Sequence, residues 1–251
     1  MISGKQIRKN KILSKTGSVF LALDHGFAMG PIKGMENLNS LISQLSEIKI
    51  DSIILNYGAL KNMDIESLND CRTPLIVHLT GSDITQGGAE KEIIYRPIDA
   101  IKMGADAVSV QLNFGTDTEQ NQIKQIASVI RQSDELGLPV LLMMYDKSNT
   151  NDYPDRLKKM VRLGLEIGAD LIKIDIKNDL SLLREICLNS PVPILVAGGS
   201  LEKTEEDFHQ KIKTYIDAGA SGVSVGRNVF QSDNPKKTLD DICNIFHEKT
   251  K

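Results

Sequence analysis

One lysine of this sequence lies inside an apolar run, where a charged side chain is costly unless it has a use. Lys173 stands in the middle of Leu171–Asp175, which has the composition of a buried strand. The two-residue period of a strand puts Ile172 and Ile174 on one face and Lys173 on the other. If the isoleucines pack outward, Lys173 points into the fold, where burial favours the neutral amine that attacks carbonyl groups. The strand position suits a Schiff-base lysine and a lysine that reaches solvent from a strand end about equally well.

Three further polar side chains follow or end apolar runs. Asp24 and His25 come directly after Leu23, and Tyr145 ends the run that begins at Val140. A carboxylate or a phenol at the edge of a pocket can transfer protons or bind substrate hydroxyls. A hydrogen-bonding role suits His25 better than metal binding, because none of the four histidines shows zinc-ligand spacing. The alternatives are a loop-capping aspartate and a packing tyrosine.

Two glycine turns near the end of the chain predict an anion site. Gly198 and Gly199 follow one apolar run, and Gly226 and Arg227 follow the next. Glycine lets backbone N–H groups approach phosphate oxygens, and arginine adds a charged pair of donors. Two such turns in succession predict phosphate binding more strongly than a single turn does. Lys33, in a turn-rich loop, is a weaker candidate for contact with an anionic substrate, because most such lysines are only solvated.

A repeated pattern of strands and helices must position these residues. Short apolar, β-branched runs recur eight times, and most are continuous rather than alternating, as in strands buried on both faces. Helix-like stretches such as Thr118–Glu135 and Pro154–Ile167 lie between them. The pattern predicts an α/β fold, a (β/α)8 TIM barrel formed by residues 1–251 as a single domain. The predicted strands are Val19–Leu23, Ser52–Leu55, Leu75–Leu79, Ala107–Leu112, Val140–Tyr145, Leu171–Ile176, Ile194–Ala197 and Gly222–Val225.

Helix ends are also marked in the sequence. Thr204 precedes three acidic residues and is typical of a helix N-cap. Gly104, Gly168 and Gly219 each stand where a helix should stop before the next strand, and glycine adopts the left-handed conformation that stops one. In such a barrel the carboxyl ends of the strands meet at one mouth, where catalytic residues lie and where the last two loops often hold phosphate.

Composition excludes several classes of protein. The 251 residues are 41% hydrophobic and 25% charged, enough for a globular core, and the formal net charge of −3 argues against nucleic-acid binding. No run is long enough to span a membrane, and the first residues are polar, without the apolar core of a signal peptide. Cys71, Cys187 and Cys243 are far apart and form no CxxC pair, so we expect reduced cysteines and a cytoplasmic location.

With these features together, the sequence resembles the archaeal-type class I fructose-bisphosphate aldolases of the DeoC/FbaB (DhnA-like) family. That family also holds 2-amino-3,7-dideoxy-D-threo-hept-6-ulosonate synthases and a thiolase acting on a phosphorylated autoinducer. The resemblance runs from about Val19 to Phe246. It is carried by the phrases LALDHGFAMGPIKG from Leu21, GADAVSVQLNFG at 104–115, LMMY at 142–145, GADLIKI at 168–174, PVPILVAGGS at 191–200 and GASGVSVGRNVFQSDNP at 219–235.

The resemblance implies roles for the candidate residues. Lys173 aligns with the Schiff-base lysine, Tyr145 with the acid/base tyrosine and Asp24 with the active-site aspartate. The two glycine turns fall where the family binds phosphate, and we add His25 and Lys33 as substrate-binding candidates. The resemblance further implies a class I aldolase that needs no metal or other cofactor. It would act on phosphorylated ketoses such as fructose bisphosphate, or on dihydroxyacetone phosphate, as a homo-oligomer, a decamer or a pentamer.

Departures from the family pattern leave the substrate open. Asp146-Lys147-Ser148 stands where the family usually has Pro-Arg-Gly, and Ser200-Leu201 where it often has Pro-Lys. Ile174-Asp175-Ile176 replaces another short family stretch. The phrases GPIKG and LNFG favour the alternative of an aminoheptulosonate-type synthase, which joins a phosphorylated ketone to aspartate semialdehyde. A non-catalytic phosphosugar-binding barrel and a barrel isomerase with paired carboxylates are also compatible with parts of the pattern.

Overall fold

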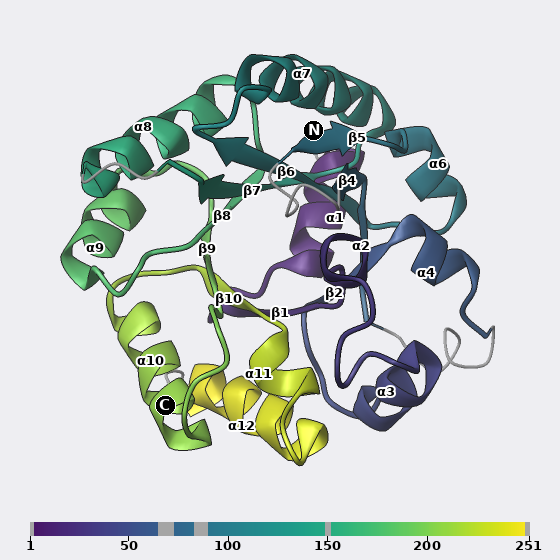
Figure 1. The fold of residues 1–251 in the computed structure, drawn as a ribbon, viewed down its shortest axis with the longest axis vertical. Helices are drawn as coiled ribbons and strands as arrows, with labels where there is room; N and C mark the ends of the chain where they lie inside the picture. The colour runs from purple at the N-terminus through teal and green to yellow at the C-terminus, as the bar shows by residue number, and fades with distance from the viewer. Residues whose placement is uncertain (1–2, 65–72, 83–89, 149–151, 249–251) are drawn as a thin grey trace.

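The structure is a computed structural model, and it describes residues 3–64, 73–82, 90–148 and 152–248. Within these residues eight parallel strands close into a barrel in the order β1-β10-β9-β8-β7-β6-β3-β2 (Figure 1). The predicted α/β barrel is confirmed, and each predicted run overlaps one barrel strand. The strands are β1 (Ser18–Ala22), β2 (Ser52–Asn56), β3 (Leu75–His78), β6 (Ala107–Phe114), β7 (Val140–Asp146), β8 (Leu171–Ile174), β9 (Ile194–Ala197) and β10 (Gly222–Val225).

Most helices form a ring outside the strands (Figure 1). The two predicted long helices are α7 (Glu119–Leu136) and α8 (Tyr153–Glu166), each within one residue of its expected bounds. The other helices after β1 are α2 (Gly26–Met29), α3 (Leu38–Leu45), α4 (Tyr57–Lys61), α6 (Pro97–Lys102), α9 (Leu180–Asn189), α10 (Glu205–Asp217), α11 (Arg227–Phe230) and α12 (Pro235–Glu248). None of the helices in the described part of the chain is long and apolar enough to cross a membrane.

The predicted helix boundaries are present. The side-chain oxygen of Thr204 accepts a hydrogen bond of 3.0 Å from the backbone N–H of Asp207 at the start of α10. Gly104, Gly168 and Gly219 have φ angles of 85°, 95° and 99°, in the left-handed region that favours glycine. Each therefore ends a helix, α6, α8 or α10, just before the next strand begins.

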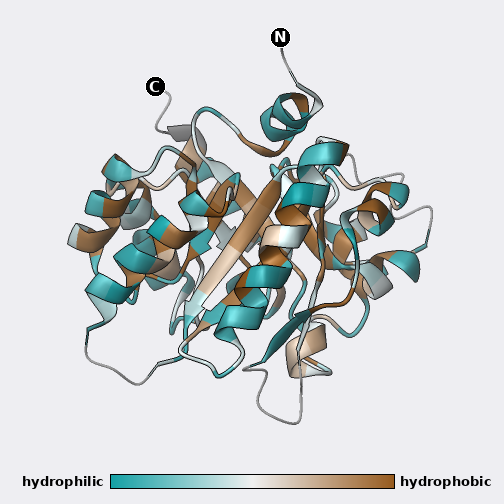
Figure 2. Cartoon of the chain, turned by 90° about the horizontal axis from the view of Figure 1, so that it is seen from above, coloured by the Kyte–Doolittle hydropathy of each residue, from teal (hydrophilic) through white to brown (hydrophobic). Residues whose placement is uncertain are grey.

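Two apolar layers hold the barrel together. Strand side chains that point outward pack under the helices, and Ile172 and Ile174 of β8 belong to this layer. In Figure 2 apolar residues line the central strands and the helix faces turned toward them. The alternation along β8 turns Leu171 and Lys173 the other way. The inner layer consists of Ile12, Phe20, Ala22, Ile54, Ile76, Ala107, Leu141, Met143, Leu171 and Leu195.

A helix that sequence reasoning missed covers the amino-terminal end of the barrel. This helix, α1 (Gly4–Ile12), lies across the ring of strands (Figure 1), and its last residue, Ile12, is fully buried in the inner layer. Arg8 donates a hydrogen bond of 3.0 Å from Nη1 to the carbonyl oxygen of Gly137, just before β7. Lys11 pairs with Asp106, just before β6, at 3.1 Å. These contacts fix α1 against the loops from which the strands start.

A second unpredicted element lies at the other end of the barrel. The chain continues from β3 into β4 (Thr80–Ser82), which pairs antiparallel with β5 (Lys91–Ile93). Strand bounds also differ slightly from the prediction. The sixth predicted strand ends at Ile174 rather than Ile176, and the fourth extends to Phe114 because its pairing with β7 continues as far as Asp146.

Candidate active site

A cavity of about 110 Å³ opens at the carboxyl ends of the strands. It contains the three residues predicted to be catalytic, together with side chains from α2, β3 and the β4–β5 hairpin. Residues that are far apart in the sequence therefore meet there, as the barrel architecture requires. The cavity is lined by Asp24, His25, Phe27, Ala28, Met29, His78, Thr80, Ser82, Lys91, Gln111, Met143, Tyr145 and Lys173.

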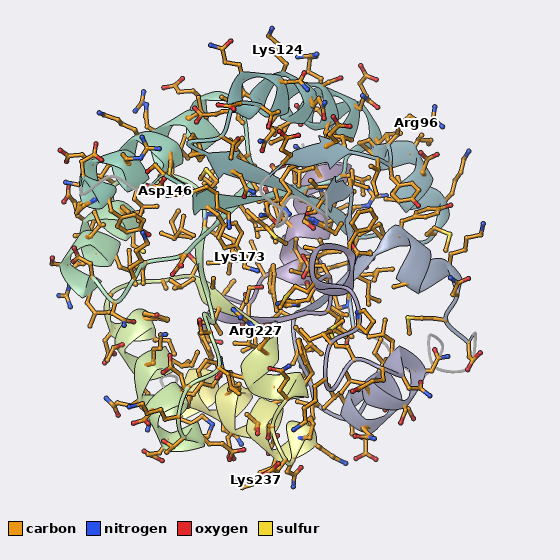
Figure 3. The ribbon with its side chains drawn as sticks, viewed as in Figure 1. Arg96, Lys124, Asp146, Lys173, Arg227 and Lys237 are labelled. Atoms are coloured by element: carbon orange, nitrogen blue, oxygen red, sulfur yellow. The ribbon has the colours of Figure 1, made fainter. Side chains whose placement is uncertain are left out.

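Lys173 projects from β8 into the interior of the barrel. It is 5% exposed, and it pairs in register with Met143 on β7 and Leu195 on β9, both residues of the inner layer. Figure 3 shows Lys173 inside the ring of strands, whereas Lys124 and Lys237 point outward from the rim. The inward direction follows from the alternation along β8, as the sequence predicts.

Tyr145 lies on β7, two residues beyond the register partner of Lys173. Residues two apart on a strand share a face, so Tyr145 and Met143 both point into the cavity. The ring is partly buried against the inner layer, and Nζ of Lys147 lies 5.8 Å from its centroid. The phenol thus occupies the cavity wall on the strand next to that of Lys173.

Asp24 follows β1 and is held beside two histidines. Its carboxylate oxygens lie 3.7 Å from Nδ1 of His25 and 3.9 Å from Nδ1 of His78. Its backbone carbonyl accepts a hydrogen bond of 2.9 Å from Nδ2 of Asn56. Burial by itself would raise the pKa of this carboxyl, but His78, His25 and Lys173 hold the pKa below its usual value. Asp24 is therefore a carboxylate that can accept hydrogen bonds or protons.

His78, the last residue of β3, is a site residue to which sequence reasoning assigned no role. It is 5% exposed, and its Nδ1 lies 2.9 Å from Oγ of Ser109 on β6. Burial lowers the pKa of His78 to about 4, against an opposing attraction from Asp24. The imidazole is thus neutral near pH 7 and supports Asp24 without adding charge to the cavity.

The two glycine turns meet beside the cavity. Arg227, at the start of α11, donates a hydrogen bond of 2.9 Å from Nη2 to the carbonyl oxygen of Gly199, whose φ is 81°. The Nε atom of Arg227 is buried and has no hydrogen-bond partner among the described residues. A Cβ on Gly226 would lie 2.5 Å from Cε1 of His25, so only glycine fits there. These contacts join the turns to each other and to the wall of the cavity. Gly198 is the first residue of the turn that follows β9.

Lys33 is not drawn into this cavity. Its side chain is exposed, and its backbone carbonyl accepts a hydrogen bond of 3.2 Å from Nε2 of Gln231, just after α11. The loop thus runs beside the second glycine turn, and contact of Lys33 with a substrate stays a prediction. Among the described residues, no group of three or more His, Cys, Asp or Glu side chains could hold a metal ion.

Three other cavity residues escaped sequence reasoning. Gln111 shares a strand face with Ala107, so alternation along β6 could have identified it. Ser82 and Lys91 lie on the hairpin, whose three-residue strands are too short to show a period. Their cavity position depends on antiparallel register, which pairs Ser82 with Lys91.

Comparison with known proteins agrees with this geometry. The sequence profile of the DeoC/LacD family aldolases matches residues 18–232, from the first barrel strand to just beyond the last glycine turn. The chain belongs to the DeoC/LacD aldolase family. The predicted family and the enzyme class, an aldolase, are thereby confirmed, and the non-catalytic barrel is set aside.

Relatives with assigned names are similar over nearly the whole length. A 2-amino-3,7-dideoxy-D-threo-hept-6-ulosonate synthase of Archaeoglobus fulgidus is 32% identical over 245 residues, covering 97% of this chain and 91% of that protein. A 2-amino-4,5-dihydroxy-6-oxo-7-(phosphonooxy)heptanoate synthase of Streptomyces griseus is 33% identical, covering 90% of this chain and 83% of that protein.

Solved structures agree with the family assignment. A Schiff-base-forming fructose-1,6-bisphosphate aldolase has a TM-score of 0.86 and 26% identity, covering 96% of this chain and 99% of that one. An archaeal fructose-1,6-bisphosphate aldolase with its catalytic lysine bound to a carbinolamine intermediate has a TM-score of 0.84 and 25% identity, covering 97% and 99%. This chain is thus similar to class I aldolases in both fold and sequence.

Proposed function

We propose that Lys173 is the Schiff-base nucleophile of a class I aldolase acting on phosphorylated ketones. The proposal rests on the position of Lys173. Its side chain is only 5% exposed, faces the barrel interior and lines the same cavity as Tyr145 and Asp24. Its place on a barrel strand beside the mouth is where catalytic groups of such barrels lie. The similarity to an archaeal aldolase with a carbinolamine on its catalytic lysine supports the same chemistry.

The proposed reaction begins at the amine of Lys173. Nζ attacks the carbonyl carbon of the ketone, and loss of water leaves an iminium ion. During cleavage the iminium accepts the electron pair of the breaking C–C bond, so that an aldehyde leaves and an enamine remains. In the synthetic direction the enamine attacks the aldehyde, and water then hydrolyses the iminium to release the product and the free amine.

Tyr145 and Asp24 have different roles in the proposed reaction. Cleavage needs a base for the hydroxyl proton beside the breaking bond, and the enamine carbon needs a proton afterwards. Tyr145 carries out both transfers, because its phenol lies on the strand next to Lys173. Asp24 remains ionised between His25 and His78 and orients the substrate hydroxyls.

The glycine turns anchor the phosphate of the ketone. Backbone N–H groups of Gly199 and Gly226 can approach phosphate oxygens closely, and Arg227 has a buried Nε without a partner among the described residues. The N–H of Gly198 instead donates a hydrogen bond of 2.9 Å to the carbonyl oxygen of Ser224, so Gly198 contributes the shape of the turn. An anchored phosphate holds the carbonyl near Lys173 and lowers the entropic cost of the attack.

The second candidate is a synthase that joins a phosphorylated ketone to aspartate semialdehyde. The observation that favours it is the set of relatives 32–33% identical over at least 90% of this chain, whose names are aminoheptulosonate and heptanoate synthases. Both candidates use the same lysine and differ in the aldehyde. We further propose a cytoplasmic location, in line with the free thiols of Cys187 and Cys243. We also propose that the chain forms a homo-oligomer.

Covalent trapping tests the proposal directly. We expect borohydride to attach dihydroxyacetone phosphate or fructose bisphosphate to Lys173, located by mass spectrometry of proteolytic peptides. The Lys173→Met variant should fold, by circular dichroism, and lose the adduct, whereas Lys124→Met on the outside of α7 should keep it. An adduct on Lys177, Lys203 or Lys91, or none at all, would refute the assignment.

A further inference from the structure

The β4–β5 hairpin places a second lysine in the cavity. Circling the barrel in strand order, β3 lies directly opposite β9, so the hairpin that follows β3 faces the glycine turns across the mouth (Figure 1). The hairpin is firmly attached there, because Oγ1 of Thr80 accepts a hydrogen bond of 3.0 Å from the backbone N–H of Gln111. Ile93 donates one of 2.9 Å from its backbone N–H to the side chain of Gln125 on α7.

Lys91 is the buried cation of this hairpin. It is 6% exposed, lines the same cavity as Lys173, and donates a hydrogen bond from Nζ to Oγ of Ser82, its register partner. No carboxylate of the described residues lies within ion-pair distance of it. Glu92, on the opposite face of the hairpin, is exposed. A buried ammonium with a single neutral partner is costly unless an anion binds there in the working enzyme.

The surrounding charges are mostly positive. Burial, followed by repulsion from Lys147, lowers the pKa of Lys91 to about 8, and Asp24 opposes the shift only in part. Lys173 adds another amine to the same cavity, where Asp24 is the only acidic residue of the described lining. An anionic ligand on the hairpin side would relieve this imbalance, and a neutral one would not.

We propose that Lys91 and Ser82 bind the anionic group of the aldehyde substrate, a carboxylate or a phosphate. The inference rests on the proposed function and deepens it. With the ketone phosphate at the glycine turns, an aldehyde on the opposite side of the mouth, at the hairpin, would lie across the cavity from that phosphate and share the cavity with Lys173 and Tyr145. An aldehyde with an anion at its far end would then have its carbonyl directed toward the enamine, between two anion sites on opposite walls.

Aldehyde selectivity tests the inference. At saturating dihydroxyacetone phosphate, kcat/KM is measured for glyceraldehyde 3-phosphate, for succinic semialdehyde and for the neutral glyceraldehyde. We expect Lys91→Met to lower kcat/KM by about ten- to a hundredfold for one or both anionic aldehydes, which is the cost of one charge-assisted contact. For the neutral glyceraldehyde, kcat/KM should fall by less than about threefold. The aldehyde that suffers the loss identifies the anion as phosphate or carboxylate. Lys91→Arg should restore much of the loss, because it keeps the charge.

Two further variants separate local from general effects. Glu92→Gln, on the outer face of the hairpin, should leave all three values unchanged. Ser82→Ala should give a smaller loss in the same direction as Lys91→Met, and it tests the site even if the lysine variant folds poorly. Equal losses for charged and neutral aldehydes, no loss for any, or a wild-type enzyme without preference for either anionic aldehyde would overturn the inference. Borohydride trapping of the ketone at Lys173 is measured in parallel, since its absence in the wild type would instead refute the proposed function.

Discussion

Arg227 reaches from the loop after β10 to the carbonyl oxygen of Gly199 in the loop after β9, through an Nη2 hydrogen bond of 2.9 Å. The two loops are thus held together by a guanidinium whose Nε is buried and without a partner among the described residues. The sequence also allows Arg227 to pair with an acid such as Asp233, but in the structure the guanidinium donates to Gly199.

Replacement of Arg227 should affect phosphorylated ketones selectively. A charge-assisted contact to phosphate contributes roughly 1.5–3 kcal/mol, so we expect Arg227→Ala to raise KM for dihydroxyacetone phosphate about ten- to a hundredfold. KM for dihydroxyacetone should change little. Arg162→Ala, on the outer surface of α8, serves as the control. Similar increases for both ketones would mean that Arg227 has only a structural role.

Removal of the phenol of Tyr145 should separate binding from turnover. Proton transfer by a positioned side chain contributes about 10²–10⁴-fold to the rate, so we expect Tyr145→Phe to lower kcat by that order. The amine of Lys173 is unaltered, and borohydride should still trap dihydroxyacetone phosphate on it. Turnover and trapping are measured on the same preparation. A variant that turns over at nearly the wild-type rate would exclude Tyr145 as the proton carrier.

Chelation should leave the activity unchanged. In the proposed reaction the iminium on Lys173 accepts the electrons of the breaking bond, so no Lewis acid is needed. We expect full activity after extensive dialysis against EDTA. A loss that added zinc restores would contradict the class I mechanism and point to His25 and His78, the two imidazoles beside Asp24, as metal ligands.

His78 should make the protein sensitive to mild acid. Its pKa in the folded chain is about 4, below the usual 6.5, so the unfolded chain binds the proton first as the pH falls. The contribution to stability is therefore complete above pH 6.5 and is lost progressively toward pH 4, amounting to at most about 3 kcal/mol. The depressed pKa of Asp24 has its effect only below about pH 4.

Urea unfolding at a series of pH values measures this effect. Between pH 6.5 and 4 the unfolding free energy of the wild type should fall more steeply than that of His78→Asn, which has no imidazole to protonate. Parallel curves for the two proteins would show that the pKa of His78 is the same in the folded and in the unfolded chain.

The strands of the barrel and the direction of Lys173 follow from patterns that each strand carries by itself, and the repetition of such strands between helices indicates the barrel. Continuous apolar runs indicate strands buried on both faces, and the isoleucines on either side of Lys173 determine which way the lysine points. Gly199 is recognisable for a similar local reason, its positive φ. Gly226 is instead required by a tertiary contact, because a Cβ there would lie 2.5 Å from Cε1 of His25.

The rest of the site depends on contacts between distant segments. His78 shares the inward face of β3 with Ile76, as alternation along the strand allows, but its neighbours Asp24 and Ser109 come from other segments that the strand by itself does not reveal. Lys91 acquires its position from a hairpin of three-residue strands. The helix α1 is polar over most of its length and is held by ion pairs and by Ile12 rather than by an apolar stripe, so periodicity does not reveal it.

Because α1 closes the far end of the barrel with Ile12 fully buried in the inner layer, the cavity is reached from the mouth at the carboxyl ends of the strands. Lys173 lies below the strand ends, while the hairpin carrying Lys91 stands above them. If Lys173 and Lys91 act as proposed, a ketone that binds first leaves the hairpin open for the aldehyde, whereas an aldehyde that binds first would hinder the approach of the ketone to the amine. In cleavage the aldehyde would then depart before the enamine is protonated and released. A barrel that is closed at one end thus favours an ordered use of the other end.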